Sequence, residues 1–363
     1  MSDRPGELAA LIDDRIRTGG PMSLATYLDL CLSHPTLGYY RTRDPLGRGG
    51  DFTTAPEISQ MFGEMIGAFV AGCWQTLGRP DRFDLVELGP GRGTLMADML
   101  RVASGLQGFN HGLRPILVEI SEPLIAAQRV ALAGHDAMWI GGVEAIEPDG
   151  PPLVVVANEF FDALPIRQLQ KSGTHWHERV VGLDGGRRSI ALAPEAVPTA
   201  EIPRALRDSA DGAVWEIGEA SCAEVATLAG RLAARTRVAL IIDYGHAKTA
   251  AGDTFQAVRD HRFTDPFERP GEADLTAHVD FEALAAAAAT AGAVARDLVT
   301  QAQFLAAMGV VSRARALGAA NPAIADSITA DLKRLTGKDA MGTLFKVLCL
   351  SSPGLAPYPF AET

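Results

Sequence analysis

One glycine-rich turn limits the possible folds of this chain more than any other segment. Residues 84–88 form a strand-like, mostly apolar run that leads directly into glycines at positions 89, 91 and 93, and a helical pattern follows. Glycine permits a tight turn and lets the backbone approach a ligand without a Cβ in the way. A strand, a glycine turn and a helix in this order predict a doubly wound α/β fold with a ligand at the turn. The alternative is an ordinary turn that binds nothing.

The spacing of the glycines distinguishes between two classes of cofactor. Thr94 stands where the dinucleotide fingerprint has its third glycine, which argues against NAD. Glu87 followed by Gly89, Gly91 and Gly93 is instead typical of the loop that binds S-adenosylmethionine (SAM) in doubly wound methyltransferases. The sequence therefore predicts SAM as the cofactor.

Two acidic residues are candidates for holding that cofactor. Glu119 ends the next apolar run, and an acid at this place accepts hydrogen bonds from ribose hydroxyls in doubly wound folds. Glu87 is expected to orient the cofactor's amino group. The alternatives are an ordinary carboxylate at a strand end for Glu119, and a partner of the helix backbone for Glu87.

Apolar runs and helical patterns alternate through most of the chain. Continuous apolar runs are typical of strands buried on both faces of a parallel sheet. Helices near residues 95–103, 123–132 and 219–234 supply the crossovers. The expected strands are residues 84–88, 115–120, 137–140, 153–157, 238–244, 294–300 and 344–350. The sequence thus predicts a seven-stranded, mostly parallel, doubly wound sheet whose last strand is antiparallel.

Four segments are expected along the chain. They are an N-terminal helical cap with a lid loop (1–80), the first half of the SAM-binding core (81–165), a β-hairpin insertion (166–211) and the second half of the core (212–363), which has a helical insert near 301–340. Hairpin turn signals at 172–173 and 184–186 indicate the insertion. Thr54 and Glu57 have the spacing of a capping box, ahead of an amphipathic helix expected to be core.

The segment after the fourth strand, residues 158–165, carries the candidate catalytic residues. Doubly wound sheets bind ligands at the carboxyl ends of their strands, so Asn158, Glu159 and Asp162 should face the reacting groups. If the acceptor is arginine, two cations must meet, and unit charges about 4 Å apart repel by about 4 kcal/mol at an effective dielectric of 20.

A carboxylate that accepts two guanidinium hydrogen bonds offsets this repulsion and fixes which nitrogen meets the methyl group. Glu159 is the first candidate for that role and Asp162 the second. Capping of the following turn is the alternative for both residues.

Composition and charge argue against several other classes of protein. The net charge of −11 disfavours nucleic acid as a partner, and no apolar run approaches the length of a membrane span. His175 and His177 share a strand face without further ligands, and the four cysteines are dispersed, so no metal site is expected. The N-terminus lacks the apolar region of a signal peptide, which predicts a cytoplasmic protein.

Several longer motifs resemble the MidA family of SAM-dependent methyltransferases, which are assembly factors for respiratory complex I. The motifs are residues 34–40, 44–47, 50–64, the glycine loop, 158–165, 243–246 and 270–281. The resemblance implies a protein arginine methyltransferase of the symmetric type. Its implied partner is the quinone-site subunit of complex I, modified during assembly. The family pattern has serine where Ala55 stands, and the missing transit peptide fits a bacterial member.

The segment before the amphipathic helix is interpreted as a cover over the SAM site. Its residues are Thr53, Thr54, Pro56, Ser59 and Gln60. Two other functions stay open at this point. One is a methyltransferase for a small molecule or another amino-acid nitrogen, and the other is a non-catalytic chaperone that keeps the SAM fold as a binding module.

Overall fold

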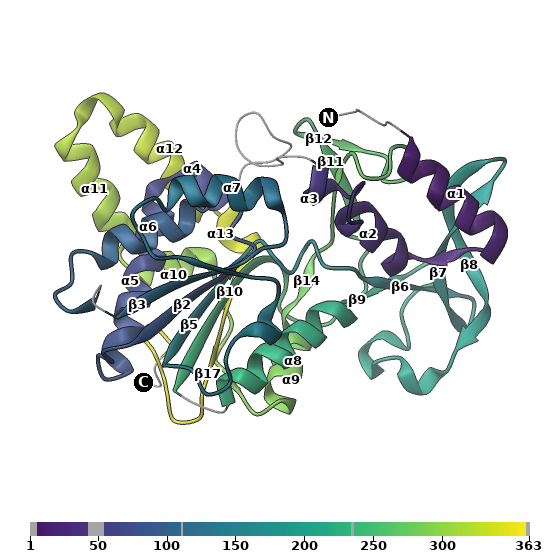
Figure 1. Cartoon of the computed structure of the whole chain (residues 1–363). Helices are drawn as coiled ribbons and strands as arrows, with labels where there is room; N and C mark the ends of the chain where they lie inside the picture. The colour runs from purple at the N-terminus through teal and green to yellow at the C-terminus, as the bar shows by residue number, and fades with distance from the viewer. Residues whose placement is uncertain (1–5, 43–53, 110–111, 234–235, 361–363) are drawn as a thin grey trace. The chain divides into compact units, whose positions relative to one another are not determined.

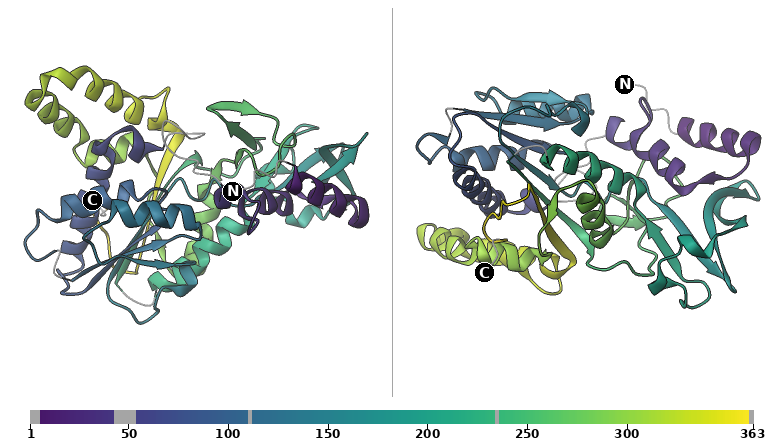
Figure 2. Two further views of the ribbon diagram at one scale, coloured as in Figure 1. Left: turned by 45° about the horizontal axis from the view of Figure 1, so that its top comes forward. Right: turned by 90° about the horizontal axis from the view of Figure 1, so that it is seen from below.

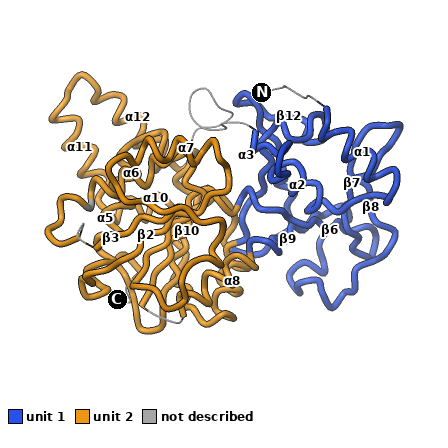
Figure 3. Tube along the Cα trace, in the orientation of Figure 1, with its two compact units in different colours: residues 1–52, 162–221, 248–280 blue, residues 53–161, 222–247, 281–363 orange. Residues whose placement is uncertain are grey.

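The chain folds into two units, each built from segments that are distant in the sequence (Figure 3). The computed structural model describes residues 6–42, 54–109, 112–233 and 236–360. Unit 1 comprises residues 1–52, 162–221 and 248–280, and unit 2 comprises 53–161, 222–247 and 281–363. The expected cap segment 1–80 therefore contributes to both units, whereas the expected insertion 166–211 lies within unit 1.

Unit 2 is built around a mostly parallel β-sheet (Figure 1). Its strands follow the order β15-β17-β10-β5-β2-β3-β4, and β16 also pairs with β17. The strand bounds are β2 (Phe83–Leu88), β3 (Leu113–Val118), β4 (Met138–Ile140), β5 (Leu153–Asn158), β10 (Arg237–His246), β15 (Val294–Ala295), β16 (Val299–Thr300) and β17 (Phe345–Ser351). Strand β17 runs antiparallel to β10, whereas β10, β5, β2, β3 and β4 are parallel neighbours. The expected mostly parallel sheet with an antiparallel last strand is confirmed, but the expected count of seven strands is not, because residues 294–300 form two short strands.

Burial explains why these apolar runs became strands. Every residue of β2 and β5 is buried, as expected for strands covered on both faces. The two strands pair in register, with Leu85 beside Val154 and Leu88 beside Ala157. Their carboxyl ends therefore lie next to each other, which is where a doubly wound sheet binds its ligand.

Helices cover both faces of this sheet. The views in Figures 1 and 2 show α5, α6 and α10 on one face and α8 and α9 on the other. Their bounds are α4 (Ala55–Ile58), α5 (Gln60–Thr76), α6 (Thr94–Ala103), α7 (Glu122–Ala131), α8 (Glu219–Ala233), α9 (Phe281–Thr290), α10 (Gln301–Ala307), α11 (Val310–Ala320), α12 (Ala325–Thr336) and α13 (Met341–Leu344). None of the helices in the described ranges is long and apolar enough to cross a membrane.

The junction between α4 and α5 differs from the expected capping box. Thr54 precedes α4, but within the described chain its side chain makes no capping hydrogen bond. Ser59 instead has extended backbone, breaks the helix and accepts a hydrogen bond from the Met61 N–H at 3.3 Å. The Glu57 carboxylate instead accepts a hydrogen bond from Thr94 of α6. The capping-box prediction was therefore wrong, whereas the amphipathic helix α5 is buried core as expected.

Unit 1 combines N-terminal helices with an antiparallel sheet (Figure 1). The helices are α1 (Glu7–Gly19), α2 (Leu24–Ser33) and α3 (Tyr39–Thr42). The sheet contains β1 (Met22–Ser23), β6 (Arg167–Ser172), β7 (His175–Asp184), β8 (Arg187–Val197) and β9 (Val214–Ile217), in the order β1-β7-β6-β9 with β8 beside β7. The hairpin turns expected at 172–173 and 184–186 are present, with Gly173, Gly185 and Gly186 in the left-handed region.

A second sheet of unit 1 was not foreseen from the sequence. It consists of β11 (Gln256–Arg259), β12 (Arg262–Thr264) and β13 (Asp274–Thr276). The expected lid loop comprises residues 38–52, and most of it, including Arg43 and Arg48, lies outside the described residues.

Candidate functional site

The glycine turn between β2 and α6 has the backbone that its sequence requires. Gly89, Gly91 and Gly93 have φ angles of 59°, 53° and 84°, in the left-handed region that side chains disfavour. A Cβ on Gly89 would lie 2.8 Å from Cδ2 of Phe160, which is too close for any other residue. Glycine at position 89 therefore lets the end of β2 approach the turn that follows β5.

Two buried polar side chains point from the same face of the sheet at this edge. Glu87 pairs with Val156 in the parallel register, and Asn158 lies two residues further along β5, so both leave the same face. Glu87 is 3% exposed and Asn158 is 8% exposed. Among the described residues, neither Oε2 of Glu87 nor Oδ1 of Asn158 has a hydrogen-bond partner.

The environment of Glu87 disfavours its charge. Burial raises the pKa of this carboxyl well above its usual range, against a smaller lowering by a hydrogen bond from the Met96 backbone. A buried carboxylate oxygen and a buried amide oxygen that lack hydrogen-bond partners are each costly. Both oxygens are acceptors, and together they suit an ammonium group, which carries only donors.

Glu119 lies directly after β3 and is oriented by neighbouring donors. Its Oε1 accepts hydrogen bonds from the backbone N–H groups of Ile120 and Ser121, both at 2.8 Å. Its Oε2 accepts one from Nε2 of Gln128 at 3.2 Å. The carboxylate is thus fixed at the edge of the sheet, at the place where a ribose is expected.

Gln128 on α7 is a site residue that the sequence reasoning missed. It is fully buried, and its Nε2 also donates to the carbonyl of Gly91 at 2.7 Å. Its Oε1 accepts a hydrogen bond from Nε1 of Trp139 at 2.8 Å. One side chain therefore ties the glycine turn to Glu119 and β4. A buried glutamine in a helix has no local sequence signal, because its partners come from three other elements.

Glu159 has an unusual backbone and an oriented carboxylate. Its φ angle is 51°, which is uncommon for a residue with a side chain and is found preferentially at functional sites. Its Oε1 accepts hydrogen bonds from the Ala55 backbone N–H at 3.0 Å and from Nδ2 of Asn158 at 3.1 Å. The candidate catalytic residues Asn158 and Glu159 are therefore in direct contact.

Asp243 on β10 holds the turn that follows Glu159. Its Oδ2 accepts hydrogen bonds from the backbone N–H groups of Phe160 and Phe161 at 3.2 and 2.9 Å, and its Oδ1 accepts from that of Tyr244. Asp243 is completely buried. The strained backbone at Glu159 is thus maintained by a neighbouring strand, and this role was not foreseen from the sequence.

The segment interpreted as a cover lies partly beside the glycine turn. Thr94, the first residue of α6, donates a hydrogen bond from Oγ1 to Oε1 of Glu57 at 2.6 Å, so α4 lies beside the glycine turn. Pro56 lies in α4, and Thr54 precedes it. Ser59 and Gln60 instead bond within α5, where Gln60 Nε2 contacts Glu64 Oε1 at 3.3 Å. Thr53 lies outside the described residues.

Asp162 belongs to unit 1, unlike the other candidate residues. It is 7% exposed, and its backbone carbonyl accepts a hydrogen bond from the Ala277 N–H at 3.0 Å. Across the residues that the structure describes, no three His, Cys, Asp or Glu side chains are grouped in a way that could hold a metal ion.

The polar groups at this edge of the sheet in unit 2 fit SAM. Glu87 Oε2 and Asn158 Oδ1 are placed to accept hydrogen bonds of the kind that an ammonium group donates, and the Glu119 carboxylate suits ribose hydroxyls. The start of α6 lies at the glycine turn, where helix N–H groups attract a carboxylate. The fold and these polar groups together define the class of doubly wound, SAM-binding methyltransferases.

Comparison with known proteins identifies the family. Residues 65–299 match the model of the family described as "Putative S-adenosyl-L-methionine-dependent methyltransferase", and the chain belongs to this family. A crystal structure of a Burkholderia thailandensis protein bound to S-adenosyl-homocysteine is 29% identical, with a TM-score of 0.83. That comparison covers 95% of this chain and 91% of the other, so SAM is the cofactor of a fold shared over the full length.

Relatives of similar length carry a more specific name. The zebrafish (Danio rerio) protein arginine methyltransferase NDUFAF7, mitochondrial, is 35% identical over 92% of this chain and 84% of its own length. The Homo sapiens protein of the same name is 34% identical over 93% of this chain and 81% of its own length. The mitochondrial names contradict the expected cytoplasmic localisation, which was based on the absence of a leader pattern.

Proposed function

We propose that this protein transfers a methyl group from SAM to an arginine side chain of a protein substrate. The observation that carries the proposal is the oriented Glu159 carboxylate at the end of β5, beside the buried acceptors for the cofactor. The names of the relatives support arginine as the acceptor, since each is called a protein arginine methyltransferase.

The residues of the site have distinct roles in this proposal. SAM supplies an electrophilic methyl group on a sulfonium sulfur. Glu159 accepts N–H hydrogen bonds from the guanidinium group and offsets the repulsion between the two cations. Asn158 and the Ala55 N–H hold that carboxylate in one orientation, so that one guanidinium nitrogen faces the methyl carbon in line.

Atoms and charges balance without a base acting before the transfer. The nitrogen lone pair forms a bond to the methyl carbon while the carbon–sulfur bond breaks, and the bonding electron pair stays on the sulfur. The product nitrogen then loses one proton to water or to Glu159. Glu87, Gly89, Gly91, Gly93 and Glu119 serve the cofactor, and Asp162 remains a second candidate for contact with the substrate.

The substrate that we propose is the quinone-site subunit of respiratory complex I during its assembly, with symmetric dimethylation as the product. The resemblance of residues 51–64 and 158–165 to the MidA family supports this partner. The name NDUFAF7, carried by relatives that match over most of the chain, supports it as well.

Transfer of labelled methyl groups into a cell lysate tests the proposal. The lysate comes from cells that lack this protein, and mass spectrometry locates the label. We expect label on an arginine of the quinone-site subunit. Label on another protein's arginine would keep the chemistry and reject the partner. Label in the small-molecule fraction, or SAM binding without transfer, would reject the proposal in favour of a small-molecule enzyme or a chaperone.

A further inference from the structure

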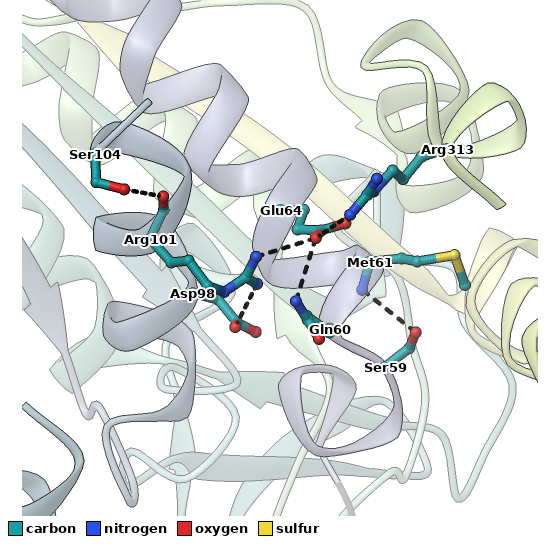
Figure 4. Close-up of polar contacts among 8 residues, drawn as sticks. All are labelled: Ser59, Gln60, Met61, Glu64, Asp98, Arg101, Ser104 and Arg313. Carbon is teal, nitrogen blue, oxygen red and sulfur yellow. Dashed lines mark hydrogen bonds and ion pairs between the residues drawn. The ribbon is translucent and has the colours of Figure 1, made fainter. Parts of the chain in front are cut away.

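A cluster of charged side chains on α5, α6 and α11 has no part in the proposed chemistry (Figure 4). At its centre lies Glu64 on α5, which is 5% exposed. Arg313 on α11 donates to both carboxylate oxygens, through Nε and Nη2, at 2.7 Å each. Arg101 on α6 donates from Nη1 to Oε1 at 3.2 Å. One buried carboxylate therefore joins three helices of unit 2.

The two arginines of the cluster favour the charged form of Glu64. Burial raises the pKa of Glu64, but hydrogen bonds and attraction from Arg313 and Arg101 outweigh it, so that the pKa is lowered overall. Asp98 accepts a hydrogen bond from Nη2 of Arg101 at 2.8 Å and orients that arginine. Two arginines and two acids leave the cluster with no net charge.

Helices α4 and α5 contact α6 at two points, and the spacing of the two contacts along the sequence is the same on both sides. Glu57 accepts from Thr94 next to the glycine turn, and Glu64 accepts from Arg101 further along the helix. Thr94 and Arg101 are seven residues apart, which is about two helical turns and one face of α6. The two contacts therefore fix the register of α4 and α5 along α6.

This register also determines the position of the Ala55 N–H. Ala55 starts α4, and its N–H donates to Oε1 of Glu159 at 3.0 Å. A shift of α5 along α6 would carry α4 with it and remove this donor from Glu159. A displacement of about 1 Å in a catalytic group can cost about 100-fold in rate.

We propose that Glu64, clamped by Arg101 and Arg313, is a positioning residue that sets the register of α4 against α6 and thereby orients the Glu159 carboxylate. Helix α11 thus acts on the site indirectly, because its Arg313 holds the Glu64 carboxylate in place. The consequence for catalysis rests on the proposed function, whereas the effect on Ala55 does not.

Hydrogen exchange of the full-length protein tests the positioning role without any acceptor. We expect peptides covering residues 54–60 to exchange about tenfold faster in Glu64→Gln and Arg313→Ala than in the wild type, because their anchoring is weakened. The C-terminal part of α5, residues 66–76, should stay protected. Arg315→Ala, an exposed arginine on the same helix, is the matched control and should exchange like the wild type. Exchange of 54–60 at the wild-type rate in both cluster variants would overturn the proposal.

A double-mutant cycle separates positioning from general stabilisation. We expect Glu64→Gln to reduce methyl transfer about tenfold with the KM for SAM nearly unchanged. Adding it to Glu159→Gln should cause no further loss, because Glu64 acts through Glu159. Additive losses would overturn the proposal. If the wild type itself transfers no methyl group to arginine, the proposed function fails, and the exchange result still decides the role of Glu64.

Discussion

At the scale of one residue, the buried carboxyl of Glu87 lowers the stability of the folded protein at neutral pH. Burial raises its pKa, and its Oε2 has no partner in the described chain. An acid whose pKa is raised by folding contributes stability that is fully present only below its unfolded value of about 4.3. That contribution is lost as the pH rises from there toward the raised folded pKa. Neutral pH therefore destabilises the ligand-free protein at this position.

Replacement of Glu87 by glutamine should remove this pH dependence. We expect the ligand-free variant to melt about 2 °C higher than the wild type at pH 7, with the difference disappearing near pH 4. SAM should bind more weakly to the variant, because an acceptor for its ammonium group is lost. Thermal melts with and without SAM measure both effects, and Glu122→Gln on the exposed surface of α7 is the control. A lower melting temperature at pH 7 would contradict this account of Glu87.

The helix pair α5 and α6 shows at the scale of elements why glycine is needed inside a helix. A Cβ on Gly63 would lie 2.5 Å from Cβ of Asp98, and one on Gly67 would lie 3.1 Å from Cα of Met99. These two glycines let α5 approach α6 closely enough for Glu64 to reach Arg101. Gly72, on the same helix, has no atom within 4 Å of such a Cβ.

Alanine substitutions at Gly63 and Gly72 should therefore have opposite effects. Gly63→Ala is expected to lower the free energy of unfolding by about 1–3 kcal/mol, through its collision with Asp98. Gly72→Ala should raise it by about 0.5–1 kcal/mol, because alanine is the better helix former. Denaturant titration measures both values. Effects of the same sign and size would show that α5 and α6 do not pack as described.

Elements with a local pattern were predictable, and contacts between distant elements were not. Strands β2 and β5 were predictable from their apolar runs, and the hairpin turns from the glycines at 173 and 185. Burial patterns and turn geometry depend on only a few neighbouring residues. The break at Ser59 was missed because the Glu57 partner, Thr94, lies on another helix. Gln128 and Asp243 were missed for the same reason, since their partners come from other elements.

At the scale of the whole molecule, the candidate site residues other than Asp162 belong to one of the two units. Glu87, the glycine turn, Glu119, Gln128 and Glu159 all lie in unit 2, whereas the β7–β8 hairpin lies in unit 1. Ligand binding stabilises the state that binds it, by about 2.7 kcal/mol at a concentration of 100 times Kd. This stabilisation should first slow the local opening of the segments that hold the ligand.

SAM should therefore protect a defined set of segments from hydrogen exchange. We expect slower exchange in residues 54–60, 87–96 and 119–128, because these carry the site or cover it. At the same early exchange times, residues 175–197 of the β7–β8 hairpin should be unchanged. Mass spectrometry of exchanged peptides, with and without SAM, provides the measurement. Protection of the hairpin alone would place the SAM site elsewhere.

The central claim, that Glu159 orients an arginine for methyl transfer, is tested most directly by one variant. Glu159→Gln keeps the shape of the side chain and removes its charge, and Glu195→Gln on an exposed strand of unit 1 is the control. Two quantities are measured on the same samples. They are the affinity for SAM and the rate of single-turnover methyl transfer to the protein substrate that the lysate experiment identifies. We predict SAM affinity within about twofold of the wild type and transfer reduced by about 100-fold. Transfer at the wild-type rate by Glu159→Gln would contradict the claim.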